Sequence, residues 1–159
     1  MTRPLLAAWA TLAIALPAQA TDFNGPARIV DGDTIEIGGR TLRLHGIDAP
    51  ETGQTCERSG GIYDCGQEAG WALAERFEHH WASCATTGLL GDLPTVICHL
   101  GGAHGINVNA HMVRRGWALA DPQTGQEFVA DEAAARTARA GLWAGHFLPP
   151  WEWRRQAGR

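Results

Sequence analysis

The order of the predicted elements places this chain in the α+β class, with a compact β part followed by helices. Short segments with alternating apolar residues and glycine turns fill the region before Gly66. The apolar period then lengthens to about four residues, which indicates a helix. Residues that can cap helices, Asn107 and Thr124, occur further along the chain and indicate two more helices. No repeat or linker divides the chain, so we predict a single domain over residues 21–159.

Glycine turns organise the β part. Gly38-Gly39 predicts a hairpin between two alternating segments, and Pro50 ends the second of them because proline removes a backbone donor. Side chains on opposite faces of a strand alternate, so Arg43 and His45 share one face. The predicted strands cover residues 27–30, 34–37, 40–47 and 95–98.

Three helices are predicted from periodicity and caps. The first has an apolar face that recurs every four residues, formed by Ala69, Leu73, Phe77 and Trp81. Asn107 can cap a short second helix that Gly116 ends. Thr124 and Glu127 have the spacing of a capping box for a third helix that runs to Gly141.

The first twenty residues have the pattern of a secretory signal peptide. Arg3 supplies the positive start, residues 5–17 are mostly apolar, and Ala18-Gln19-Ala20 offers a cleavage site. The apolar run is shorter than the roughly 20 residues that a membrane helix needs. We therefore predict a signal peptide over residues 1–20, export to the periplasm or beyond, and no membrane span in the mature chain. An uncleaved anchor is the alternative.

Four cysteines lie in the part predicted to be exported: Cys56, Cys65, Cys84 and Cys98. An even number in an exported domain indicates disulfides, for which three connectivities are possible. Each sequential pair brackets a loop, so we predict the pairing 56–65 and 84–98. Free buried thiols are the alternative.

Two aspartates end neighbouring strands. Asp33 and Asp48 lie at the ends of two strands that the Gly38-Gly39 hairpin brings side by side. Two carboxylates and a backbone carbonyl, here that of Ala49, suit Ca²⁺ with water completing the shell, and Mg²⁺ or Mn²⁺ have similar preferences. The alternative is that Asp31-Gly32-Asp33 is only a turn.

The segments 30–34 and 43–51 resemble the staphylococcal nuclease (thermonuclease) family. Segments 113–118, 141–143 and 153–154 match exported bacterial members in the same order. The resemblance implies an OB-type five-stranded β-barrel with about three flanking helices. It also implies metal-dependent hydrolysis of phosphodiesters in DNA or RNA.

The resemblance assigns roles to four side chains. It places Asp33 and Asp48 at the calcium-ligand positions and makes Glu51 the residue that activates the attacking water. Arg43 lies where one arginine binds the phosphoryl oxygens, a task that suits a planar guanidinium. Outside this context, a loop glutamate and a strand arginine are ordinary surface residues.

One part of the family pattern is missing. Active members carry an Asp-x-Tyr-Gly-Arg segment whose arginine is a second phosphate ligand, and an ungapped count puts Leu93 at that place. No Arg or Lys lies between Arg76 and Arg114. Losing one preorganised donor typically costs about 10²–10³ in rate. His99 and His104, on the nearby hairpin, are the candidate replacements by position.

The predicted function is a monomeric, exported, Ca²⁺-dependent nuclease with weak activity on single-stranded DNA or RNA. A formal net charge of −4 does not favour tight, sequence-independent binding to nucleic acid. The alternative function is a catalytically inactive binding module for nucleic acid or another ligand. A structural envelope protein is a third possibility that no feature specifically supports.

Overall fold

The computed structural model describes residues 22–102 and 104–158, so the predicted signal peptide lies outside the described residues. It confirms the α+β class: in these two ranges, a mixed sheet of seven strands is combined with four α-helices. Within the described ranges, no helix has the length and apolar character needed to cross a bilayer.

The main sheet has the strand order β1-β8-β9-β4-β3-β2, and β10 extends it beside β9. The β4–β9 pair is parallel and the other pairs are antiparallel. This hydrogen-bonded path is open at β1 and β2 in the described chain, so the expected barrel is not closed. The sheet strands are β1 (Asp22–Gly25), β2 (Ala27–Ile29), β3 (Thr34–Ile37), β4 (Arg40–Leu44), β8 (Ala82–Leu90), β9 (Leu93–Leu100) and β10 (Ile106–Asn107).

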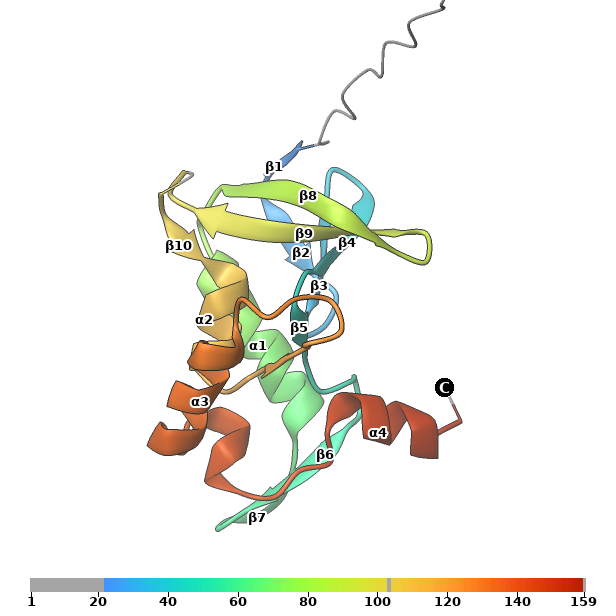
Figure 1. The fold of residues 1–159 in the computed structure, drawn as a ribbon, viewed down its shortest axis with the longest axis vertical. Coiled ribbons are helices and arrows are strands. Elements are labelled where there is room, and N and C mark those ends of the chain that lie inside the picture. The colour runs from blue at the N-terminus through green and yellow to red at the C-terminus, as the bar shows by residue number, and fades with distance from the viewer. Residues whose placement is uncertain (1–21, 103, 159) are drawn as a thin grey trace, which may run out of the picture.

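Smaller elements surround this sheet. Two short two-stranded pairings form, β5 with β11 and β6 with β7. Figure 1 shows α2 and α3 on one side of the molecule and α4 on the other, with α1 between them. The remaining elements are β5 (Ile47–Asp48), β6 (Thr55–Arg58), β7 (Gly61–Asp64), α1 (Cys65–Phe77), α2 (Val108–Arg114), β11 (Leu119–Ala120), α3 (Val129–Ala138), the 3₁₀ turn η1 (Gly141–Ala144) and α4 (Pro150–Gln156).

The β3–β4 hairpin forms at Gly38-Gly39 as predicted, but the strand predicted over 40–47 is wrong in its length. β4 ends at Leu44, and the chain turns at Gly46, whose φ is 74°. A Cβ at Gly46 would lie 2.8 Å from the Phe128 ring. The chain therefore bends against Phe128, and the next two residues pair with β11 instead of continuing in the main sheet.

Helix α1 confirms most of the predicted apolar face. Ala69, Leu73 and Phe77 are buried, and the Asp64 carboxylate caps the helix by accepting from Gln67 N. Trp81 was wrongly placed on this face, because the helix ends at Phe77 and Trp81 is 67% exposed. The chain leaves the helical path at Glu78, whose ψ is 123°, and His79 follows with a positive φ of 59°.

The second predicted helix is confirmed and the start of the third is wrong. Asn107 Oδ1 accepts from Ala110 N at 3.0 Å and caps α2. Helix α3 begins only at Val129 and has no side-chain cap. Thr124 instead donates its hydroxyl to the Asp121 carbonyl at 3.2 Å, which closes a turn. The third helix stops at Ala138 rather than at Gly141.

Both predicted disulfides are present. The first, Cys56–Cys65, joins β6 to the first residue of α1. The second, Cys84–Cys98, links directly opposed residues of β8 and β9, and both of its cysteines are fully buried. No cysteine in the chain is left free. The two bridges thus fix the sheet and the start of the helix beside which the candidate site lies.

Candidate active site

Asp33 is positioned by a tight turn between β2 and β3. Its backbone N donates to Asp31 Oδ1 at 3.0 Å, and its carbonyl accepts from Leu44 N at 2.8 Å. Gly32 makes this turn possible, because a Cβ there would lie 2.7 Å from Ala49 Cβ and 2.8 Å from Ala69 Cβ. The carboxylate of Asp33 is consequently buried and receives a hydrogen bond from Ala49 N at 2.9 Å.

Asp48 and Arg43 meet Asp33 at the end of the hairpin. Arg43 Nη2 lies 2.9 Å from Asp33 Oδ2 and 2.8 Å from Asp48 Oδ1. Asp48 belongs to β5 and, like Asp33, is 3% exposed. A single guanidinium nitrogen thus lies between the two buried carboxylates.

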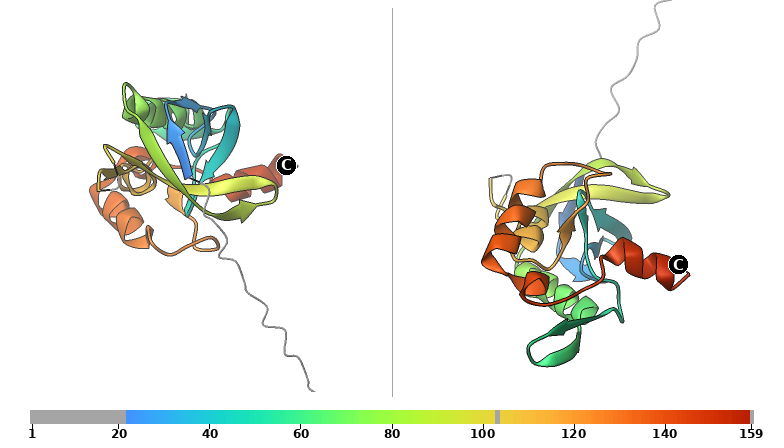
Figure 2. Two further views of the ribbon diagram at one scale, coloured as in Figure 1. Left: turned by 90° about the horizontal axis from the view of Figure 1, so that it is seen from above. Right: turned by 60° about the horizontal axis from the view of Figure 1, so that its bottom comes forward.

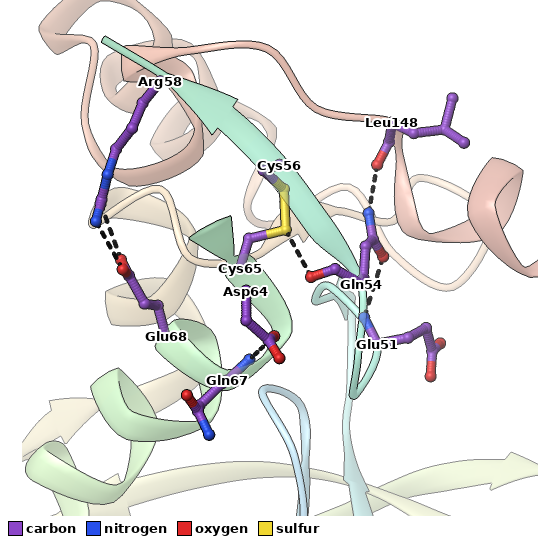
Figure 3. The surroundings of a disulfide bond; sticks show 9 residues. All are labelled: Glu51, Gln54, Cys56, Arg58, Asp64, Cys65, Gln67, Glu68 and Leu148. Atoms are coloured by element: carbon purple, nitrogen blue, oxygen red, sulfur yellow. Dashed lines mark hydrogen bonds and ion pairs between the residues drawn. A yellow bond between two sulfur atoms is a disulfide. The ribbon is translucent and has the colours of Figure 1, made fainter. Parts of the chain in front are cut away.

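Glu51 lies on a loop that packs against the start of α1. A Cβ at Gly66 would be only 1.9 Å from the Glu51 carbonyl oxygen, so the loop and the helix approach each other closely. Gln54 holds the same loop: its side chain accepts from Glu51 N at 3.1 Å and donates to Leu148 O at 2.7 Å. Figure 3 shows Gln54 between Glu51 and Leu148, next to the Cys56–Cys65 disulfide.

A residue from the far end of the chain completes the cluster. Arg154 on α4 donates through Nη1 and Nη2 to the two oxygens of Asp48, at 2.9 and 2.8 Å. Its Nη1 also lies 2.5 Å from Glu51 Oε1. These hydrogen bonds raise the pKa of Arg154, that to Asp48 most strongly, so its guanidinium stays charged. In both views of Figure 2, α4 is separate from the other helices.

Burial raises the pKa of Asp33 to about 7, against the opposing effect of Arg43. Asp31 and Asp48 contribute in the same direction as burial, because nearby negative charges disfavour a further carboxylate. Additional positive charge beside Asp33 would offset this cost of ionisation. The site therefore favours a cation between its carboxylates.

The donor set suits a hard divalent cation in part. Asp33 Oδ2 and Asp48 Oδ1 converge on one point, now taken by Arg43 Nη2, and carboxylate oxygens are preferred ligands of Ca²⁺. Among the described residues, no group of three or more His, Cys, Asp or Glu side chains is arranged to hold a metal. A bound Ca²⁺ would therefore take further ligands from backbone oxygens, such as that of Ala49, and from water.

The cluster borders a small cavity of about 200 Å³. Arg43, Asp48 and Arg154 line it together with Leu90 from the β8–β9 hairpin. The side chains of the two arginines are 19% and 32% exposed, so both reach solvent from this wall. The arrangement therefore places two guanidinium groups and the carboxylate of Asp48 along one cavity, where the arginines offer positive charge to an anion.

The structure brings together the side chains of Asp33, Asp48, Arg43 and Glu51, as the sequence motif predicted. It places Leu93 at the start of β9, where it is 38% exposed. His99 and His104 do not line the cavity. Sequence reasoning missed Arg154 as a site residue, although Trp153-Arg154 belonged to the segments that matched exported family members.

Comparison with known proteins gives consistent results. The family model described as "Staphylococcal nuclease homologue" matches residues 41–145. Protein ParB of Escherichia coli is 36% identical in an alignment that covers 95% of this chain and 89% of that protein. Micrococcal nuclease of Shigella flexneri is 34% identical in an alignment that covers 94% of this chain and 90% of that protein.

Two further similarities are partial. Succinoglycan biosynthesis protein ExoI of Rhizobium meliloti (strain 1021) is 42% identical over 74 residues, which cover 45% of this chain and only 39% of that protein. Among solved structures, the extended Tudor domain of Drosophila melanogaster Tudor-SN (p100) aligns with a TM-score of 0.50 and 18% identity. That alignment covers 65% of this chain and 47% of the other, and it supports the fold alone.

Proposed function

The chain belongs to the family of staphylococcal nuclease homologues, and on this premise we propose that it is an exported, divalent-metal-dependent phosphodiesterase acting on single-stranded DNA or RNA. One observation carries the proposal: Asp33, Asp48 and Glu51 are joined by Arg43 and Arg154 into a single charged cluster. The cluster borders a cavity that an anion can enter. All its members come from one chain, which is consistent with a monomeric enzyme.

Asp33, Asp48 and the Ala49 carbonyl would hold the metal. Calcium bound there would supply Lewis-acid stabilisation of the charge that develops on the phosphoryl oxygens. Asp33 and Asp48 keep the hairpin and β5 together, so the ligands are arranged before substrate binds. Arg43 contributes a planar donor group at the cavity wall, where it can contact a non-bridging phosphate oxygen.

Glu51 acts as the general base. Its Oε1 is engaged by Arg154. Oε2 can accept a proton from a water molecule while the water oxygen bonds to phosphorus. The bond from phosphorus to the leaving ester oxygen then breaks, and that oxygen takes up a proton. The products are one phosphomonoester end and one hydroxyl end.

Two features support export. Residues 1–20 have the composition of a signal peptide, and all four cysteines of the chain form disulfides. Disulfides persist in oxidising compartments such as the periplasm and are rare in the cytosol.

We expect weak activity if no other group replaces the arginine of the family's Asp-x-Tyr-Gly-Arg segment. Leu93 stands at its place, and one preorganised donor is typically worth about 10²–10³ in rate. The neighbouring positions Leu89 and Leu90 are also exposed leucines, so this hairpin tip supplies apolar surface instead of positive charge. Turnover then depends on whether another part of the chain supplies a cation.

Metal-dependent cleavage tests the proposal. Mature protein is incubated with end-labelled single-stranded DNA and RNA in millimolar Ca²⁺, then with a chelator, then with Ca²⁺ restored. We expect fragments in the first and third conditions only. Asp33→Asn should abolish them, and Glu36→Gln should not, because Glu36 pairs with Arg28 at the surface. Cleavage that survives the chelator, or no cleavage at all, would overturn the proposal; in the second case a binding module would remain.

A further inference from the structure

Helix α4 brings a second arginine to the site from outside the segment that carries the family motif. Arg154 is 106 residues from Asp48 in sequence and lies beyond residues 41–145, which the family model matches. Resting on the function proposed above, we propose that Arg154 binds the substrate phosphodiester opposite Arg43. It would thereby supply from α4 the charge that the β8–β9 hairpin lacks.

The placement of Arg154 is supported by the segment that precedes α4. His146 pairs with Glu57 through backbone hydrogen bonds of 2.7 and 2.8 Å, which attach this segment to β6. Two residues further on, Leu148 O accepts from the fully buried Gln54 side chain. Pro150 then occupies the first position of α4, where its fixed φ suits a helix start. These contacts hold the N-terminal end of α4 against the loop that carries Glu51.

The charge balance of the cluster assigns a task to Arg154. Three carboxylates and two guanidinium groups are in direct contact, so with all groups ionised the cluster carries one excess negative charge. A divalent cation would change this to one excess positive charge, which a single phosphodiester group neutralises. Without Arg154, the cation-loaded cluster would be neutral, and its complex with the phosphodiester would carry one uncompensated negative charge. The second arginine is therefore what makes the loaded site electrostatically complementary to its substrate.

The geometry of Arg154 also fits phosphate binding. The two arginines approach Asp48 from different elements, β4 and α4, and both line the cavity. The guanidinium of Arg154 forms a two-pronged contact with Asp48, the same planar arrangement that recognises a phosphate group. With a cation beside Asp48, this fork is free to turn toward a phosphate in the cavity.

Binding measurements test the inference without relying on turnover. In a Glu51→Gln background with Ca²⁺, affinity is measured for a short DNA oligonucleotide and for the same oligonucleotide with one neutral methylphosphonate linkage. The affinity for the unmodified oligonucleotide divided by the affinity for the methylphosphonate form reports the contribution of the phosphate charge. We expect Arg154→Ala to lower this ratio about tenfold, because a hydrogen bond to a charged group is at stake. Arg154→Lys should give an intermediate value, since lysine keeps the charge and loses the planar fork.

Arg155→Ala is the matched control, because Arg155 is the exposed neighbour on the same helix. It should leave the ratio unchanged. Each ratio is internal to one variant, so a partly unfolded population does not alter it. In the active background, Arg154→Ala should also lower kcat/KM by about 10²–10³.

Three results decide the outcome. A lower ratio confined to Arg154 variants supports the inference. An unchanged ratio, or tighter binding and faster cleavage in Arg154→Ala, overturns it, because Arg154 would then merely occupy the carboxylates. If the unmodified protein does not cleave, the proposed enzymatic function fails, while the affinity ratio still decides whether Arg154 binds phosphate.

Discussion

Gln54 and Leu148 are 94 residues apart in sequence and are joined by a hydrogen bond of 2.7 Å from Gln54 Nε2 to the Leu148 carbonyl. The same amide group accepts from Glu51 N through its oxygen, at 3.1 Å. One buried side chain therefore connects the loop that carries Glu51 to the segment that leads into α4. This connection explains how residues from opposite ends of the domain share one site.

Replacing Gln54 by leucine should destabilise the protein by about 2–4 kcal/mol, because Glu51 N and Leu148 O each lose a partner in a partly buried setting. Cleavage should fall as well, since both Glu51 and α4 lose their fixed positions. Urea unfolding followed by tryptophan fluorescence measures the first effect. Gln67→Leu is the control, because Gln67 is exposed on α1. The free energy of unfolding of this variant should differ from that of the unmodified protein by less than about 0.5 kcal/mol. Equal stability of the two variants would refute the role of Gln54.

Gly66→Ala should displace the Glu51 loop. The added Cβ would lie 1.9 Å from the Glu51 carbonyl oxygen, so backbone must move at a cost of about 1–3 kcal/mol. We expect lower stability together with reduced turnover. Gly70→Ala, one turn later on the same helix, would meet nothing nearer than Asp31 C at 3.9 Å. It should gain about 0.5–1 kcal/mol from improved helix propensity. The prediction fails if Gly66→Ala is as stable and active as Gly70→Ala.

Calcium should raise the melting temperature of the protein. A ligand that binds only the folded state stabilises it by about 2.7 kcal/mol at one hundred times its Kd, which calorimetry detects as a shift of several degrees. Asp33→Asn should abolish the shift because it removes a proposed ligand at the centre of the cluster. Glu36→Gln, three residues away on the surface of β3, should retain it. An undiminished shift in Asp33→Asn would place the cation elsewhere.

The part of the site that the sequence revealed is local. Arg43 and Asp48 are five residues apart, and Asp33 and Ala49 are 16 apart, so one hairpin and its flanking turns bring them together. Glycine turns and alternating apolar residues report such short-range geometry directly. The two disulfides were predictable for the same reason, because each closes a short loop between neighbouring cysteines.

Arg154 could not be predicted in the same way. Its position depends on the packing of a C-terminal segment against β6 and Gln54, and no periodicity encodes a contact across 106 residues. Strand β8 was missed for a related reason: its stretch Thr86-Thr87-Gly88 has turn-like composition, and its pairing with β9 makes it a strand. In both cases tertiary contacts decide what local sequence leaves open.

The most direct test of the proposed chemistry is the cleavage rate of Glu51→Gln, measured on single-stranded DNA in saturating Ca²⁺. Glutamine keeps the shape of the side chain and cannot act as a base, so kcat should fall by at least about 100-fold with DNA affinity retained. Glu57→Gln, an exposed glutamate on the adjacent β6, should cleave at the rate of the unmodified protein. Cleavage by Glu51→Gln at the unmodified rate would contradict the assignment of Glu51 and, with it, the active site described above.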